Sequence, residues 1–106
     1  MLVRVFIKRR FREGAARHVF SLIRKIRARA MNRKGYISGE TLIDSTDSRK
    51  TMVIGTWQSM DDGLSWEQDP RRKELEAQLE RFPEAPAEYE VYVYSKYYLS
   101  VSGDGS

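Results

Sequence analysis

Residues 35–57 read GYISGETLIDSTDSRKTMVIGTW, and this stretch decides the fold of the chain. Residues 36–43 and 51–57 are rich in β-branched and aromatic side chains, which is the composition of β-strands. Between them, residues 44–48 form a dense cluster of turn-forming residues, DSTDS. The stretch therefore predicts a β-hairpin, and we expect Gly35 to cap the end of a preceding helix.

A strand and a helix are predicted before the hairpin. Residues 2–10 place Val3, Val5 and Ile7 on one side of a strand and further apolar residues on the other side. Over residues 13–31, apolar residues recur at three- and four-residue spacing, which predicts a helix about 28 Å long. The remaining positions of this segment are mainly basic, so we expect them to face solvent.

Two helices are predicted after the hairpin. Ser59 is followed three residues later by Asp62, a spacing typical of a helix start, and predicts a short helix through about residue 68. Asp69 and Pro70 predict the start of the next helix, because aspartate is a favoured N-cap and proline a favoured first helical residue.

Residues 88–96, EYEVYVYSK, predict the last strand, with side chains alternating between its two faces. The order of elements is then βαββαβ, the arrangement of ferredoxin-like folds. We therefore expect an α+β fold in one domain of residues 1–96, with a four-stranded antiparallel sheet and helices on one face. Residues 97–106 are expected to form a flexible tail, because they offer little apolar side-chain mass for packing.

The second face of the expected sheet is also partly apolar. The strands carry apolar or aromatic residues on both sides, but the helices can cover only one side. A single copy of the chain would therefore expose a large apolar patch. We predict a homodimer through this sheet face, with an interface of at least about 1,200 Å².

The residue composition excludes several kinds of site. The 106 residues contain no cysteine, which excludes disulfides, thiolate nucleophiles and cysteine-ligated metals. His18 is the only histidine and is expected on the surface of the first helix, so we predict no metal site and no bound cofactor. No apolar run approaches the roughly 18 residues of a membrane span, and we expect a cytoplasmic protein without a membrane partner.

The charge is distributed unevenly along the chain. Residues 1–34 hold 12 Lys and Arg against the single acid Glu13, whereas residues 35–106 hold 7 against 14 acids. The basic part could contact phosphate groups or an acidic membrane surface, or it could be balanced by the acidic part of the same chain or of a second copy. The second interpretation is favoured, because the basic residues lack the interleaved aromatic residues of single-strand binders. We therefore do not expect nucleic acid as a partner.

Three parts of the sequence resemble the antibiotic biosynthesis monooxygenase domain family. They are the hairpin start GYISGETL, the strand ending in Trp57 with a short helix that carries Trp66, and the last strand EYEVYVY. The resemblance covers residues 1–96 and implies a dimeric α+β barrel. Family members include oxygenases without cofactors that convert polyketide phenols to quinones, haem-degrading enzymes, and proteins that act on small signalling sugars or quinols. The resemblance thus implies a cofactor-independent monooxygenase with a small aromatic or quinol-type substrate.

Haem degradation is not implied by the residues at the matching positions. Haem-degrading members use an asparagine on the first strand, a tryptophan on the helix after the hairpin, and a histidine ten positions later. This sequence has Ile7, Trp66 and Glu76 there, so the axial ligand of the iron is missing. Of the residues used by the quinone-forming oxygenases, only Trp66 can be matched.

Three residues are candidates for catalysis. Trp66 could stack on an aromatic substrate or donate its indole N–H to a developing oxyanion, or it could be a core residue. Glu40 could be a general base if it is buried, although an exposed cross-strand partner is the favoured interpretation. Tyr92 is a possible phenol donor, with packing in the dimer interface as the alternative.

The candidates for substrate binding are Arg4, Ser38, Thr56 and Trp57. Arg4 could bind an anionic substrate, but a salt bridge across the sheet is the simpler explanation.

Two functions remain open: an oxygenase with a pocket between sheet and helices, or a non-catalytic dimer that binds a small ligand or a protein. A buried Glu40 or Tyr92 beside Trp66 would favour the enzyme, and an interior filled by side chains would favour the binding protein.

Overall fold

The structure is a computed structural model, and it describes residues 1–94 of the chain. Its elements are, in order, β1 (Val3–Arg10), α1 (Ala16–Ala30), β2 (Tyr36–Ile43), β3 (Lys50–Trp57), α2 (Met60–Glu67), α3 (Pro70–Leu79) and β4 (Glu88–Val93). This is the predicted order, with α2 and α3 as the two consecutive helices after the hairpin. The predicted end of the last strand at residues 95–96 and the expected tail at residues 97–106 lie outside the described residues.

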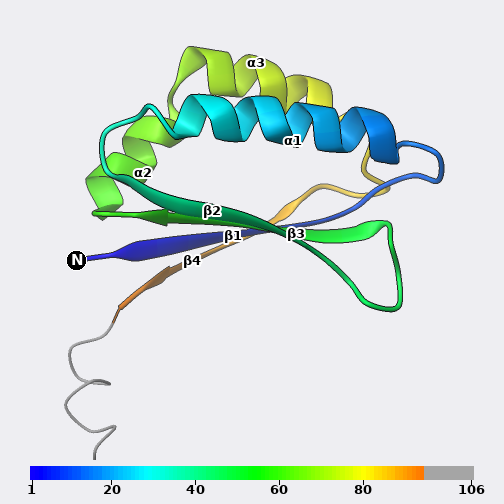
Figure 1. Cartoon of the computed structure of the whole chain (residues 1–106), viewed down its shortest axis with the longest axis horizontal. Coiled ribbons are helices and arrows are strands. Elements are labelled where there is room, and N and C mark those ends of the chain that lie inside the picture. The colour runs from blue at the N-terminus through cyan, green and yellow to red at the C-terminus, as the bar shows by residue number, and fades with distance from the viewer. Residues whose placement is uncertain (95–106) are drawn as a thin grey trace, which may run out of the picture.

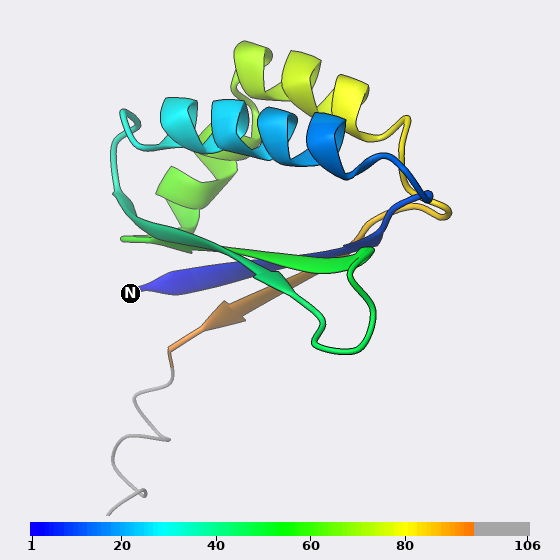
Figure 2. The same cartoon turned by 45° about the vertical axis from the view of Figure 1, so that its right-hand side comes forward.

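The four strands form one antiparallel sheet in the order β2-β3-β1-β4. β2 and β3 pair as the predicted hairpin, with Glu40 opposite Ile54 and Leu42 opposite Met52. Figure 1 shows α1 and α3 next to each other above the sheet, with α2 at one end of it. The view in Figure 2 confirms that all three helices lie on the same side. The ferredoxin-like α+β fold is therefore confirmed.

The register of the strands separates the side chains into two faces. Val5 of β1 lies opposite Gly55 of β3 and Val91 of β4, and side chains alternate from these positions. The side that faces the helices is formed by Val3, Val5, Ile7, Arg9, Gly39, Thr41, Val53, Gly55, Trp57, Tyr89 and Val91. The opposite side, the open face of the sheet, carries Arg4, Phe6, Lys8, Ser38, Glu40, Leu42, Met52, Ile54, Thr56, Glu90 and Tyr92.

Two groups of buried side chains hold the helices on the sheet. The first joins α1 to α3 and consists of Phe11, Ala15, Val19, Leu22, Ile23, Leu75 and Leu79. The second lies at the other end of the sheet and consists of Val3, Ala30, Trp57 and Trp66. Ile26 of α1 packs against both groups, so the interior between them remains apolar.

The starts of α2 and α3 agree with the sequence prediction. The Ser59 Oγ accepts a hydrogen bond from the amide of Asp62 at 3.1 Å. The Asp69 carboxylate accepts one from the amide of Arg72 at 2.9 Å, with Pro70 as the first helical residue. In residues 1–94, none of the helices has the length and apolar character needed to cross a membrane.

The end of α1 differs from the prediction. The helix ends at Ala30 rather than residue 31, and Met31 caps it in a right-handed conformation. Tight turns follow, in which the amide of Arg33 donates to the carbonyl of Ala30 at 2.9 Å. The prediction that Gly35 caps the helix is wrong, because Gly35 lies beyond these turns with φ of +83°. A Cβ at this position would lie 2.2 Å from the Asp62 carboxylate, so glycine is needed where the chain enters β2.

Candidate functional site

A cavity of about 150 Å³ lies between the sheet and the helices and is partly open to solvent. Its sheet side is lined by the helix-facing residues of β1 and β3, such as Val5 and Val53. Ile23 and Ile26 of α1 and Leu79 of α3 line the opposite side. An apolar cavity of about this size holds one aromatic ring, since benzene binds in an engineered cavity of roughly 150 Å³. The cavity is therefore suited to one ring of an aromatic molecule, and its open side leaves a fused second or third ring room to extend toward solvent.

Three aromatic residues form one wall of the cavity. The rings of Trp57 and Trp66 stack with centroids 5.9 Å apart, and Tyr36 contacts Trp57 edge to face at 5.5 Å. Because Gly55 has no side chain, the indole of Trp57 can lie close to the backbone there. The Trp57 Nε1 is 3.3 Å from the position that a Cβ of residue 55 would occupy. The indole thus lies across the helix-facing side of β3. We call Tyr36, Trp57 and Trp66 the aromatic wall.

Ion pairs close one end of the cavity. The Arg9 side chain is 1% exposed and bonds to Glu76 at 2.7 Å and to Glu80 at 3.3 Å. Arg72 contacts the second oxygen of Glu76 at 3.7 Å, and its guanidinium lies 5.9 Å from the ring centre of Trp66. Each lining arginine at this end is therefore paired with a carboxylate, which a buried charge requires.

Tyr89 also lines this end of the cavity. Tyr89 is only partly buried, but the loss of water around its hydroxyl, reinforced by the charge of Glu76, raises its pKa above the ordinary value of 10. The phenol therefore stays protonated over the physiological pH range. It is a hydrogen-bond donor rather than a base.

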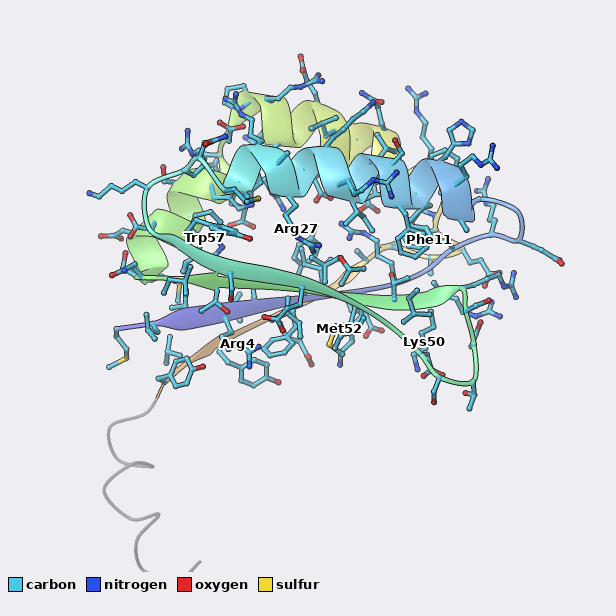
Figure 3. The ribbon with its side chains drawn as sticks, viewed as in Figure 1. Arg4, Phe11, Arg27, Lys50, Met52 and Trp57 are labelled. Atoms are coloured by element: carbon cyan, nitrogen blue, oxygen red, sulfur yellow. The ribbon has the colours of Figure 1, made fainter. Side chains whose placement is uncertain are left out.

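The other end of the cavity is lined by Arg27, which reaches from α1 to β2 (Figure 3). Its Nη2 donates a hydrogen bond to the Thr41 Oγ1 at 2.6 Å. Gly39 lies one helix-facing position before Thr41 and provides space for this side chain. A Cβ at Gly39 would lie 3.0 Å from the Arg27 Nε and 2.8 Å from the Tyr36 hydroxyl. The guanidinium and the phenol therefore converge over Gly39.

The structure divides the residues singled out in the sequence between the two faces of the sheet. Trp57 and Trp66 line the cavity and are 3% and 9% exposed. The other five lie on the open face of the sheet: Arg4, Ser38, Glu40, Thr56 and Tyr92. The seven residues therefore do not form a single site.

Three of the candidates on the open face, Arg4, Glu40 and Tyr92, have side-chain partners there. Arg4 pairs with Glu40 at 3.6 Å, and both side chains are partly exposed. This agrees with the predicted salt bridge of Arg4 across the sheet and with the favoured interpretation of Glu40 as an exposed cross-strand partner. Tyr92 packs edge to face on Phe6 at 5.4 Å. Neither Glu40 nor Tyr92 lies beside Trp66, because the sheet separates them. His18 is exposed on α1 and stacks on Phe82.

The positions compared with haem-degrading enzymes do line the cavity: Ile7, Trp66 and Glu76. Their donor set does not suit haem iron. Glu76 supplies a carboxylate in place of an imidazole, and both of its oxygens are held by arginines. In the described part of the chain, no group of three or more His, Asp or Glu side chains is arranged to hold a metal ion.

Sequence reasoning missed Arg9, Arg27 and Gly39. Arg9 shares the alternation of Val5 and Ile7, which could have placed it on the same face. Arg27 lies four residues after Ile23 and is half-buried, whereas Arg24 and Lys25 are exposed. A helical projection could have shown this position. Nothing local marks Gly39, since its role depends on a side chain from α1.

No protein-family model matches the chain, and no curated protein matches its sequence. Solved structures do match. A conserved protein from Methanosarcina mazei Go1 aligns with a TM-score of 0.86 at 13% identity, covering 90% of this chain and 94% of that one. A proposed antibiotic biosynthesis monooxygenase from Nitrosomonas europaea aligns with a TM-score of 0.83 at 7% identity, covering 90% and 91%.

SnoaB, a cofactor-independent oxygenase from Streptomyces nogalater, aligns with a TM-score of 0.78 at 14% identity. The alignment covers 91% of this chain and 96% of SnoaB. These identities are too low to transfer an activity, but the agreement of the backbones extends over nearly the whole length. The chain therefore has the fold of the antibiotic biosynthesis monooxygenase-like proteins.

Proposed function

We propose that this protein is a cofactor-independent monooxygenase that acts on a small aromatic or quinol-type substrate in the cavity beneath the helices. The observation that carries the proposal is the aromatic wall of Tyr36, Trp57 and Trp66 beside a mainly apolar space of about 150 Å³. Support also comes from the similarity of the fold to that of SnoaB, a cofactor-independent oxygenase.

The chemistry needs little from the protein when the substrate itself can reduce oxygen. A phenol with a free para carbon reacts with O₂ to give a quinone, so that one oxygen atom becomes the new carbonyl. The other leaves as water with the hydrogen from that carbon and the hydroxyl proton. The cavity would exclude bulk water, and the aromatic wall would hold the ring. The indole N–H groups of Trp57 and Trp66 are available to stabilise a phenolate oxygen.

One observation favours a non-catalytic ligand-binding protein instead. Two glutamates line the cavity: Glu76 is held by Arg9 and Arg72, and Glu67 is exposed to solvent at the end of α2, so neither is a buried general base for a substrate. The oxygenase proposal therefore requires a substrate that is ionised at neutral pH or loses its proton to solvent as it binds. A binding protein has no such requirement.

The test is oxygen uptake by purified, metal-stripped protein with anthrones and 1-naphthol, which have a free carbon at the position to be oxidised. We expect uptake above the buffer blank with at least one of them, and a slower rate in Trp66→Phe, which keeps a ring but loses the N–H. Glu40→Gln on the open face of the sheet is the matched control and should retain the rate. Oxygen uptake no faster than the blank would favour the binding protein. Loss of oxygen uptake in Glu40→Gln but not in Trp66→Phe would place the site on the open face of the sheet.

We also propose that two copies associate through the open face of the sheet, as the sequence predicts, and that the protein is cytoplasmic. The dimer is supported by large apolar side chains that remain accessible there, including Leu42, Tyr92 and Tyr94, at 49%, 56% and 46% exposure. The cytoplasmic location is supported by the lack of cysteine.

A further inference from the structure

We propose that Arg27 makes the cavity selective for an aromatic ligand that carries an anionic oxygen group, a carboxylate or a phenolate. This inference uses the cavity of the proposed function and names its ligand class. It concerns recognition alone, so it can hold or fail independently of any reaction with oxygen.

Arg27 is held in a defined position at the cavity. Its side chain crosses from α1 to β2, where Thr41 accepts one of its five N–H groups at 2.6 Å (Figure 3). The residue is half-buried, so the guanidinium is partly removed from water. A charge fixed in this way can bind an opposite charge with less loss of side-chain entropy than a free surface arginine.

The partners of Arg27 differ from those of the other arginines that line the cavity. Arg9 and Arg72 are each paired with Glu76. Among residues 1–94, the structure pairs Arg27 with the neutral Thr41 hydroxyl and with no carboxylate. A half-buried guanidinium with unused N–H groups and no counter-charge favours an anion in its neighbourhood.

Gly39 allows two hydrogen-bond donors to come close to the sheet and to each other, so that one anion can contact both. The Arg27 Nε and the Tyr36 hydroxyl are 3.0 and 2.8 Å from the same point above Gly39, the point that a Cβ would occupy. Two donors from different elements thus converge there. A carboxylate or phenolate oxygen accepts hydrogen bonds from both kinds of donor.

The same tyrosine connects this polar point to the aromatic wall. Tyr36 contacts Trp57 edge to face at 5.5 Å, and Trp57 stacks on Trp66. A ligand with its ring on the tryptophans can therefore place an anionic oxygen near Arg27. A neutral aromatic of the same shape would keep the ring contacts and lose the charge-assisted hydrogen bonds.

The test compares 1-hydroxy-2-naphthoate with its neutral amide, 1-hydroxy-2-naphthamide, by tryptophan fluorescence quenching without oxygen. We expect the wild type to bind the naphthoate about tenfold more tightly than the amide, the value of one charge-assisted hydrogen bond. Arg27→Gln should lose about this factor for the naphthoate and change little for the amide. Arg24→Gln removes the same charge from an exposed position on α1 and should change neither affinity.

Arg27→Lys keeps the charge and should retain part of the preference, and thermal unfolding of each variant shows whether it is folded. Equal binding of naphthoate and amide by the wild type would overturn the proposal. The proposal would also be overturned if Arg27→Gln lost the same affinity for both ligands. It would equally be overturned if Arg24→Gln lost as much affinity for the naphthoate as Arg27→Gln does.

Oxygen uptake with the same two ligands separates this inference from the proposed function. Preferential binding of the naphthoate, without oxygen uptake with it or with the anthrones and 1-naphthol, would support anion recognition and refute the oxygenase. Equal uptake and equal binding with both ligands would sustain the oxygenase and remove the role of Arg27.

Discussion

The ring of Trp57 on β3 stacks on that of Trp66 on α2, with centroids 5.9 Å apart and an angle of 27° between their planes. This contact fixes α2 to the sheet and forms most of the aromatic wall. Trp57→Ala should lower the free energy of unfolding by about 3–5 kcal/mol, as large core truncations do. Trp66→Phe keeps a ring and should cost less than about 1.5 kcal/mol. Urea unfolding measures both, and an equal cost for the two variants would contradict this division of roles.

Asp69 should make stability depend on pH at the acid end. Its side chain is 1% exposed, and hydrogen bonds from Arg29 hold the pKa of the carboxyl at about 2, below its ordinary 3.8. Because the folded-state pKa is the lower one, the stabilisation is complete above about pH 5 and is lost as the pH falls toward 2.

Asp69→Asn keeps an oxygen that can cap the helix but loses the charge of a buried ion pair, so it should lower the free energy of unfolding by about 2–4 kcal/mol at pH 7. Between pH 5 and 2 the variant should lose less stability than the wild type does. Urea titrations at several pH values measure this, with the exposed Asp61→Asn as control. Parallel pH curves for the wild type and Asp69→Asn would show that another carboxylate is responsible.

Gly39→Ala should disturb the position of Arg27. The added Cβ would lie 2.8 Å from the Tyr36 hydroxyl and 3.0 Å from the Arg27 Nε, so both groups must move. We expect affinity for 1-hydroxy-2-naphthoate to fall by about tenfold, the loss expected for one such hydrogen bond. Gly63→Ala adds the same methyl group at a lining position with ordinary contacts, the nearest atom being 3.7 Å away, and is the control. Equal affinities of the two variants would argue against a binding point over Gly39.

Tyr92→Lys should separate the proposed dimer. Tyr92 is 56% exposed on the open face of the sheet, so a charge there should not prevent folding of one copy but would be buried without a partner in the interface. Sedimentation velocity should show a dimer for the wild type and a monomer for the variant. Met31→Lys, at a residue 62% exposed next to α1, should remain dimeric. A monomeric wild type at micromolar concentration would refute the predicted association.

Structural features that are determined by a few consecutive residues could be predicted from the sequence. The hairpin, the helix cap at Ser59 and the helix start at Asp69 each depend on such a short segment, and the structure contains all three. The fold class followed from the order of these elements. The end of α1 was less accessible, because the turns after Ala30 have no strong local signal.

The location of the site depended on which face of each strand the helices cover. Alternation shows that Tyr89 and Val91 share a face and that Tyr92 lies on the other. It does not show which face is covered, because both carry apolar or aromatic residues. Glu40 and Trp66 could therefore be grouped in one site from the sequence, although the sheet separates them. Arg27 is one of five Lys and Arg residues of α1, and its half-buried position and its contact with Thr41 distinguish it from the other four.

The measurement that tests the central claim most directly is an NMR titration of the protein with 1-hydroxy-2-naphthamide, observed at the methionine methyl groups and the two indole N–H groups. Met60 lines the cavity, and Met52 lies on the open face of the sheet (Figure 3). If the ligand binds beneath the helices, the signals of Met60, Trp57 and Trp66 will shift while that of Met52 stays in place. Shifts at Met52 without shifts of the indole signals would contradict the account and place the ligand on the other face.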